Sequence, residues 1–379
     1  MLRIACISTS QIPSRRANSI RIMKVCSALA ELGHDVRLWT LGSDPEIPWE
    51  DLAKHYGVKN RFAMNWIADL PWPRGWLYSL RAVRAARRWR ADLYYVWPYQ
   101  AAALASRMGL PTLLELHDRP HGRMAPVLFR RFLSGGGAWR VAIITNALLD
   151  WVRGFYAELL DPPSTIVTPS GVDLERYHNL PTAEEARKLL DLPDRLTAGY
   201  TGHLYRGRGL DLMVELAQHY PEVNFLWVGG EETAVERWRA RLEQLGLENI
   251  SLLGFLPNEE LPMVQASCDV LLMPYEQRIE GSSGGDTAAF ASPMKVFEYL
   301  AAGRAILASD LPVIREILNE SNSMLLPADD TAAWIEALGM MMSDPGKRSW
   351  LAAHAKEDAS QYSWKARAER ALEGLKLDI

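Results

Sequence analysis

The chain has 379 residues, 48% of them hydrophobic, and a formal net charge of −4 at pH 7. This length and apolar content predict a globular protein of two domains or slightly more, and no apolar run approaches the length of a membrane span. The isoelectric point of about 6.1 argues against broad binding to nucleic acid. Cys6, Cys26 and Cys268 lack metal-binding spacing, so we expect buried free thiols and a cytoplasmic protein.

Strands and helices are predicted to alternate along the first half of the chain. Ile20–Leu32 has the periodicity of an amphipathic helix, and Gly33 closes it. Short apolar runs predict strands at Arg3–Thr9, Val36–Thr40, Leu93–Trp97, Thr112–Leu116, Ala142–Thr145 and Thr165–Thr168. Pro169–Asp173 then breaks the pattern, which predicts a hinge between two domains.

The alternation begins again in the second half. Leu210–Tyr220 is predicted to be a helix that follows a glycine-rich turn. Further strands are predicted at Ala198–Tyr200, Asn224–Val228, Ile250–Leu253, Val270–Met273 and Ala305–Ala308. This alternation predicts parallel sheets with helices on both faces, and therefore two Rossmann-like, doubly wound α/β domains with a ligand cleft between them. We place them at residues 1–178 and 179–355.

The segment Ser292–Ser309 carries the most informative pattern in the chain. Ser292 and Pro293 are typical of the cap and first position of a helix, and a helix N-terminus suits an anion. Lys295 follows in the first turn, where a cation opposes the helix dipole unless a negative ligand compensates it. Glu298 lies three residues on and shares a helix face with Lys295. A cation for phosphate beside a carboxylate for ribose hydroxyls predicts a nucleotide-sugar site.

A glycine-rich turn offers a second element of this site. Gly202–Gly209 follows a predicted strand and opens the helix at Leu210. Its glycines would let the backbone approach a diphosphate, and Arg206 and Arg208 would neutralise the phosphates. Such a turn is also compatible with an ordinary loop. We interpret it as part of the site because ligands bind at the carboxyl ends of the strands in doubly wound sheets.

His117 and Asp118 end the predicted strand at Thr112–Leu116. A His-Asp dipeptide is often structural, with the carboxylate capping a helix. At a strand end, however, the histidine can reach a ligand cleft. We therefore predict that His117 contacts the ligand and that Asp118 either caps the next helix or orients the imidazole ring.

Basic residues are concentrated in two stretches of the first half. No acidic residue occurs between Asp69 and Asp92, or from Arg119 to Leu149. The arginines of these stretches are Arg74, Arg81, Arg84, Arg87, Arg88, Arg90, Arg119, Arg123, Arg130, Arg131 and Arg140. A solvated helix face explains either stretch alone. The two together, interleaved with tryptophans, favour a surface for anionic lipid or for a phosphorylated acceptor.

Taken together, these motifs resemble those of retaining GT-B glycosyltransferases of family 4 along nearly the whole chain. The segments that carry the resemblance are Ser14–Val36, Glu115–Asp118, Pro169–Asp173, Gly202–Gly209, Gly254–Pro257, Ser292–Ala302 and Tyr362–Arg370. The resemblance implies a final helix, within residues 356–379, that crosses back to the first domain. It also implies transfer of a sugar from a nucleotide-diphosphate donor to a polysaccharide, lipid-linked or other glycan acceptor.

The same resemblance implies roles for individual residues. Catalytic roles fall to His117, Arg208 and Lys295. Donor phosphate binding falls to Ser292, His203, Arg206, Arg208 and Lys295. Glu298 would bind the ribose, and Phe255 and Leu256 would bind the base. Contacts with the donor sugar or acceptor fall to Ala17, Asn18, Ser19, Asp118 and Asp286.

Two positions depart from the family pattern. The family commonly has an arginine five positions before the phosphate-binding cation, and this chain has His203 there. The family also tends to have a second glutamate eight positions before the ribose carboxylate, and this chain has Phe290 there. The usual contact of that glutamate with the sugar would then be missing or would come from residues 281–286, so the identity of the donor sugar stays open.

The expected mechanism follows from the residue types. No Asp-x-Asp pair follows a predicted strand, so we expect no metal and no cofactor, with Arg208, Lys295 and a helix dipole in place of a divalent ion. No nucleophilic carboxylate is expected near His117, which favours same-face substitution with retained configuration. Two alternatives stay open, namely a nucleotide-sugar epimerase on the same scaffold and a catalytically weak nucleotide-sugar-binding subunit. The expected partners are a nucleotide-sugar donor, a glycan or lipid-linked acceptor and an anionic membrane surface on its cytoplasmic side, but no nucleic acid.

Overall fold

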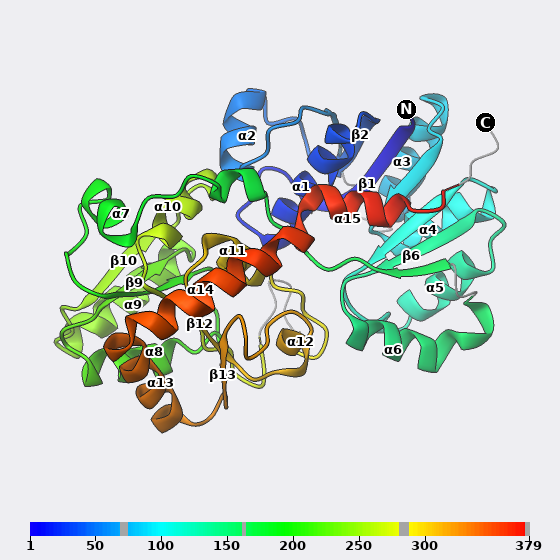
Figure 1. Ribbon diagram of the computed structural model, residues 1–379. Helices are drawn as coiled ribbons and strands as arrows, with labels where there is room; N and C mark the ends of the chain where they lie inside the picture. Colours follow the sequence, from blue (N-terminus) through cyan, green and yellow to red (C-terminus); the bar gives the residue numbers. More distant parts are fainter. Residues whose placement is uncertain (69–74, 161–163, 280–287, 376–379) are drawn as a thin grey trace. The chain divides into compact units, whose positions relative to one another are not determined.

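The computed structural model describes residues 1–68, 75–160, 164–279 and 288–375. The chain divides into two compact units (Figure 1). The first, the N-terminal unit, contains Met1–Ser170 and the residues from Trp364 onward, and the second, the C-terminal unit, contains Gly171–Ser363. Each unit has a parallel sheet covered by helices, as the strand–helix alternation predicts.

The sheet of the N-terminal unit has, among the residues described, seven parallel strands in the order β3-β2-β1-β4-β5-β6-β7. The strands are β1 (Arg3–Gln11), β2 (Asp35–Leu41), β3 (Ala63–Ile67), β4 (Leu93–Val96), β5 (Thr112–Leu116), β6 (Ala138–Ile143) and β7 (Thr165–Val167). Every residue of β4 and β5 is buried, including Glu115 of β5. The strand order reverses between β1 and β4, and in such sheets the loops diverge at that point and leave space for a ligand.

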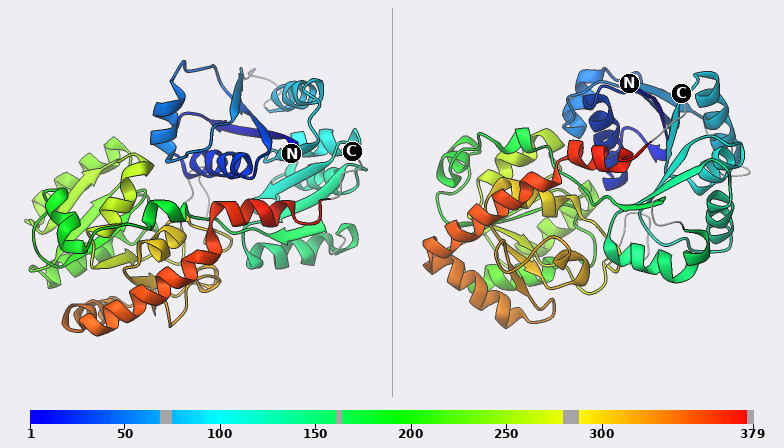
Figure 2. Two further views of the ribbon diagram at one scale, coloured as in Figure 1. Left: turned by 45° about the horizontal axis from the view of Figure 1, so that its top comes forward. Right: turned by 45° about the vertical axis from the view of Figure 1, so that its right-hand side comes forward.

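The helices of this unit form two layers. They are α1 (Ala17–Glu31), α2 (Trp49–Tyr56), α3 (Trp76–Arg88), α4 (Tyr99–Arg107), α5 (Ala125–Leu133), α6 (Asn146–Tyr156) and α15 (Trp364–Leu372). Helix α4 packs between α3 and α5, whereas α1 packs against α2 and α15. Right-handed crossovers place these two groups on opposite faces of the sheet. Figures 1 and 2 show α15 lying beside α1, so the last helix completes the α1 layer.

The described part of the C-terminal unit has a sheet of six strands in the order β10-β9-β8-β11-β12-β13. The strands are β8 (Thr197–Thr201), β9 (Asn224–Val228), β10 (Ile250–Gly254), β11 (Val270–Met273), β12 (Ala305–Ser309) and β13 (Met324–Leu326). The longer helices are α7 (Ala183–Leu189), α8 (Leu210–His219), α9 (Glu232–Gln244), α11 (Met294–Ala302), α13 (Thr331–Ser343) and α14 (Pro345–Ala359). The strand order reverses between β8 and β11, so this unit repeats the arrangement of the first.

The structure differs from the sequence-based elements at the sheet edges. The edge strands β3 and β13 were not predicted, and β6 begins at Ala138 instead of Ala142. No residue of β3 is fully buried, so it lacks the apolar run that identifies an interior strand. The three cysteines are buried free thiols, as expected.

The chain changes unit at two places. The first lies between Ser170 and Gly171, inside the segment predicted to be a hinge, and the second lies between Ser363 and Trp364. Helix α14 packs on α11 within the C-terminal unit, so this unit extends to Ser363. The residues from Trp364 onward lie in the N-terminal unit.

Candidate active site

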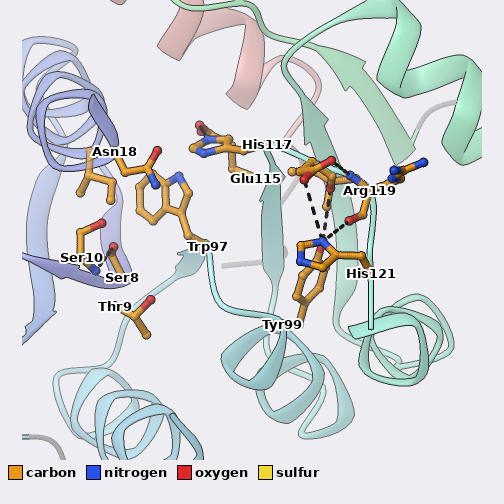
Figure 3. Close-up of a pocket in the computed structure, with 13 residues that line it drawn as sticks. Ser8, Thr9, Ser10, Asn18, Trp97, Tyr99, Glu115, His117, Arg119 and His121 are labelled. Atoms are coloured by element: carbon orange, nitrogen blue, oxygen red, sulfur yellow. Dashed lines mark hydrogen bonds and ion pairs between the residues drawn. The ribbon is translucent and has the colours of Figure 1, made fainter. Parts of the chain in front are cut away.

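A pocket of about 230 Å³ opens at the reversal point of the N-terminal sheet (Figure 3). Residues that follow β1, β4 and β5 meet there, because the carboxyl ends of parallel strands share one sheet edge. The lining residues are Ser8, Thr9, Ser10, Asn18, Ile22, Trp97, Tyr99, Glu115, Leu116, His117, Asp118, Arg119 and His121. The predicted residues Asn18, His117 and Asp118 are therefore brought together in one pocket.

The two neighbours of Asn18 have other positions. Ala17 begins α1 and Ser19 is buried, and neither lines the pocket. The Ser19 hydroxyl donates to the carbonyl oxygens of Ser14 at 3.0 Å and Arg16 at 2.8 Å. Ser19 thus stabilises the loop before α1. A role for it in contacting the ligand stays a prediction.

Glu115 is the centre of a buried charge network beside the pocket. Its side chain has no solvent exposure. Its Oε1 accepts from His117 Nε2 at 2.5 Å and lies 2.9 Å from Arg367 Nη2, and its Oε2 accepts from the Tyr95 hydroxyl. Burial raises the pKa of the Glu115 carboxyl, but Arg367 and the hydrogen bond from His117 more than offset this, so the pKa lies well below its usual range. The carboxylate is ionised and fully partnered.

Arginines from two helices flank this carboxylate. Arg367 comes from α15 and is buried, and its Nε donates to the Pro169 carbonyl at 2.9 Å. Arg21 comes from α1, and its Nη2 donates to Ser170 Oγ at 2.9 Å. Burial, reinforced by Arg21, lowers the pKa of His117, and Glu115 opposes the shift without reversing it. The imidazole ring is therefore neutral at neutral pH.

A carboxylate does contact His117, because Glu115 bonds directly to its ring. Glu115 is nevertheless unsuited to act as a nucleophile, since its oxygens are buried and hold three partners. Asp118 is 41% exposed and accepts a hydrogen bond at 2.7 Å from the backbone N–H of Arg119. Because His117 bonds to Glu115, the residue that orients the ring is Glu115 and not Asp118.

In the C-terminal unit, Lys295 is a buried cation without a hydrogen-bond partner among the described residues. Its Nζ lies 3.6 Å from the centre of the Tyr200 ring and 5.2 Å from that of Tyr275. Burial, reinforced by Arg208, lowers the pKa of Lys295 well below its usual range, and Glu298 opposes the shift. Two aromatic faces stabilise the ammonium only in part, so a bound anion would compensate a charge that the unit leaves unpaired.

The helix that carries Lys295 begins one residue later than predicted. Helix α11 begins at Met294, and Pro293 is its N-cap with extended backbone and no side-chain hydrogen bond. The prediction that Ser292 caps the helix is therefore wrong, although Ser292 is buried beside it. The N-cap residue Pro293 makes no side-chain hydrogen bond, and the positive end of this helix is suited to an anion.

The glycine-rich turn is shaped by its contacts with Lys295 and β11. Gly202 has φ +148°, and a Cβ there would lie 2.5 Å from Lys295 Nζ. Gly209 has φ +70° and precedes α8, and a Cβ there would overlap the carbonyl of Pro274. Only glycine fits at both positions, so this turn packs directly against the lysine. The guanidinium of Arg208 lies 4.7 Å from the Tyr275 ring centre, on the same aromatic residue as Lys295.

The other predicted residues of this unit occupy several positions. Glu298 is half-buried one turn after Lys295, and its charge acts on Lys295. Phe255 and Leu256 are half-buried at the carboxyl end of β10. Arg206 is exposed, whereas the His203 ring stacks on Tyr205 at 4.6 Å. Phe290 is half-buried. Asp286 and the segment 281–286 lie outside the described residues.

Sequence reasoning missed the partners of the predicted residues. Glu115 belongs to the segment Glu115–Asp118, which carries part of the family resemblance. No sequence pattern near it, however, indicates that its partner is Arg367 of α15. Tyr200 and Tyr275 both come at the ends of strands beside the reversal point, which is the signal that could have identified them. Within the part of the chain that the structure describes, no three or more His, Cys, Asp or Glu residues gather as metal ligands would. No helix in the described ranges combines the length and apolarity that crossing a bilayer requires.

Known families match both units of the chain. Residues 19–176 match the family described as Glycosyltransferase Family 4, and residues 195–344 match the one described as Glycosyl transferases group 1. The chain belongs to the glycosyltransferases of family 4. The enzyme therefore transfers a sugar from a nucleotide-sugar donor.

Individual proteins resemble this glycosyltransferase along most of its length. A 2-deoxystreptamine N-acetyl-D-glucosaminyltransferase of Streptomyces fradiae is 27% identical over 95% of this chain and 90% of its own. A D-inositol 3-phosphate glycosyltransferase of Actinosynnema mirum is 24% identical over 98% of this chain and 96% of its own. The Anabaena protein HepE, solved in complex with UDP and glucose, superposes with a TM-score of 0.74 at 17% identity over 99% of this chain and 100% of its own. The structural likeness shows the GT-B fold.

The Glu115–Arg367 pair predicts a pH-dependent contribution to stability. Arg367→Met leaves a buried carboxylate without its cation, so the free energy of unfolding at pH 7 should fall by about 3–5 kcal/mol. Because the folded pKa of Glu115 is depressed, its stabilisation is present above the unfolded value of 4.5 and is lost as the pH falls below it. The gap between the two proteins should therefore narrow in acid, as measured by urea unfolding at several pH values.

The matched control for this measurement is Arg370→Met, which changes an exposed arginine on the same helix. Its effect should stay within about 0.5 kcal/mol at every pH. Equal stability of the Arg367 and Arg370 variants at pH 7 would contradict the buried ion pair.

Proposed function

We propose that this enzyme moves a sugar from a UDP-sugar to a hydroxyl group of a glycan or lipid-linked acceptor, without a metal and with retained configuration. The observation that carries the proposal is the buried ammonium of Lys295, which has no hydrogen-bond partner among the described residues. A cation held in this state is suited to an anionic ligand. The UDP in HepE, which has the same fold, supports a uridine diphosphate donor.

The proposed chemistry rests on stabilising the leaving diphosphate. When the bond between sugar and phosphate breaks, negative charge grows on the phosphate oxygens. Lys295, Arg208 and the N-terminus of α11 are positive groups held by the fold, so they would stabilise this charge without reorganising. Losing one such group typically costs about 2.7–4 kcal/mol of transition-state stabilisation.

Same-face substitution, instead of a covalent sugar–enzyme intermediate, is proposed on the state of Glu115 in the N-terminal pocket. Glu115 is buried and holds three partners, so a covalent sugar–Glu115 intermediate would break an ion pair. We infer that the acceptor hydroxyl attacks from the face that the diphosphate leaves, and that a phosphate oxygen takes the acceptor proton. His117 would contact the sugar from the pocket, and Glu298 would accept hydrogen bonds from the ribose hydroxyls.

The function is tested by measuring nucleotide release from a panel of UDP-, GDP-, CMP- and dTDP-sugars. The acceptors to be compared are 2-deoxystreptamine and D-inositol 3-phosphate, which the names of the relatives suggest, and a lipid-linked oligosaccharide. We expect release of UDP that requires an acceptor and is unaffected by EDTA, with the anomeric configuration of the donor kept in the product. An isomerised donor without transfer would identify an epimerase, and binding without turnover would identify a binding subunit.

Replacing Lys295 should weaken donor binding without lowering the stability of the unliganded protein. Lys295→Met removes the cation that holds the diphosphate, so the affinity for UDP measured by calorimetry should fall at least tenfold. The same change removes an unpaired buried charge, so the melting temperature of the unliganded protein should not fall. Glu298→Ala should also weaken UDP binding.

The control for the Lys295 and Glu298 variants is Lys356→Ala, which changes an exposed lysine on α14 of the same unit. This control should leave UDP binding unchanged. Normal UDP binding by both the Lys295 and Glu298 variants would overturn the assigned donor site.

We further propose a peripheral position at the cytoplasmic face of an anionic membrane. Helix α3 carries exposed arginines at positions 81, 84, 87 and 88, while its opposite side is buried through Tyr78, Ala82 and Val83. A helix with such a basic outer face is attracted to anionic lipid by roughly 1 kcal/mol per arginine near the surface.

Arg84→Glu combined with Arg88→Glu should abolish sedimentation of the enzyme with vesicles that contain phosphatidylserine. The control is Arg237→Glu combined with Arg239→Glu, which makes the same change in net charge at exposed positions of α9. The control should sediment like the parent protein. No sedimentation of the parent, or equal sedimentation of both variants, would remove the membrane proposal.

A further inference from the structure

The network around Glu115 joins three parts of the N-terminal unit that lie far apart in the sequence. Tyr95 comes from β4, Glu115 and His117 from the end of β5, and Arg367 from α15. Of these side chains, that of His117 is 22% exposed and lines the pocket, whereas those of Glu115 and Arg367 are 0% and 3% exposed. Glu115 and His117 both line the pocket, and of the two only His117 has an exposed side chain.

We propose that the last helix positions His117, because Arg367 fixes the buried carboxylate of Glu115 and Glu115 fixes the ring of His117 with its proton on Nε2. Glu115 and Arg367 are then positioning residues, and Nδ1 of His117 is the atom presented to a hydroxyl group of the substrate. The role of the ring toward substrate rests on the proposed function, whereas the orientation and tautomer of the ring are inferred from the network alone.

The tautomer follows from the donors and acceptors in the network. Glu115 is ionised, so its oxygens only accept hydrogen bonds. His117 Nε2 lies 2.5 Å from Oε1 and must therefore carry the proton. A neutral ring then has a lone pair on Nδ1, which makes no hydrogen bond to the described residues. Nδ1 can accept from a hydroxyl group but cannot donate to an oxygen.

The charges around the ring keep it neutral. Arg21 faces it from α1 and Arg367 from α15, and the Glu115 carboxylate opposes them. A second proton on the ring would add a third positive charge beside one buried negative charge. The arrangement thus favours a fixed hydrogen-bond acceptor over a general acid.

Several contacts fix the position of the Arg367 side chain. Its Nη1 donates to the Tyr95 hydroxyl at 3.3 Å, in addition to its contacts with Pro169 and Glu115. Helix α15 is fixed further by Arg140 of β6, whose Nη1 donates to the Ala371 carbonyl at 3.1 Å. Pro169 lies next to the residue at which the chain leaves the unit, and α15 begins where the chain returns. The two places at which the chain changes unit therefore lie within a few residues of Arg367 or of its bonding partner Pro169.

The ring arrangement is tested by 15N NMR of histidine-labelled protein, with the His117 signal assigned by His117→Asn. The parent should show the neutral tautomer protonated on Nε2 at neutral pH. Glu115→Met and Arg367→Lys should lose this single tautomer, whereas Arg370→Met should keep it. A parent ring protonated on Nδ1, or a Glu115→Met variant that keeps the parent signal, would overturn the proposal. Glu115→Met and Arg367→Lys keep a side chain of similar length, and the dispersion of the remaining histidine signals reports whether each variant is folded.

The role toward substrate is tested by comparing the Kd of UDP-glucose with that of UDP. Loss of one hydrogen bond to the sugar should weaken UDP-glucose about tenfold in His117→Ala and in Glu115→Met, and leave UDP unchanged. Equal loss for both ligands would assign these residues to the fold and overturn their role in positioning. If the parent itself binds UDP-glucose no better than UDP, the donor assignment has failed, and the NMR result still decides whether Glu115 and Arg367 orient the ring.

Discussion

The buried charges of the two units differ in how they are partnered, and both candidate sites depend on this difference. In the N-terminal unit the Glu115 carboxylate is surrounded by Arg367, His117 and a tyrosine hydroxyl, so nothing is left for a ligand to pair with. In the C-terminal unit the Lys295 ammonium is buried against two aromatic rings and lacks a hydrogen-bond partner in the described chain. Because an unpaired buried charge is unfavourable, it indicates a ligand that supplies the missing anion.

Backbone geometry makes this placement of Lys295 feasible. The turn after β8 passes so close to the lysine that a side chain at Gly202 would collide with it. The N-cap residue of α11, Pro293, makes no side-chain hydrogen bond, and the positive end of that helix lies within one turn of Lys295. A positive helix end, a buried amine and a guanidinium near one tyrosine form a site of fixed polarity. Such a site suits a reaction in which negative charge grows on a leaving diphosphate.

The N-terminal pocket depends on residues of α15, which are distant in sequence from the residues that line it. Arg367 is both a stabilising partner of a buried carboxylate and, in our proposal, the anchor that fixes the imidazole of His117. These two roles are compatible because Glu115 has two oxygens and can accept from several donors at once. The family match establishes glycosyl transfer, and the network adds a physical reason why α15 belongs to the N-terminal unit.

The sequence by itself determined the α/β class, the repeated doubly wound arrangement and the interior strands, because apolar periodicity and turn residues are local signals. It also placed His117 at a strand end and Lys295 with Glu298 on one helix face, since these relations depend only on spacing along an element. The half-buried edge strand β3 lacked such a signal, and the cap assigned to Ser292 was off by one residue because Pro293 takes an extended conformation. Only the tertiary structure decided that Glu115 pairs with Arg367 and that Lys295 lies between Tyr200 and Tyr275. The partner of a buried charge depends on which distant elements the sheet order brings together, and no local pattern records that.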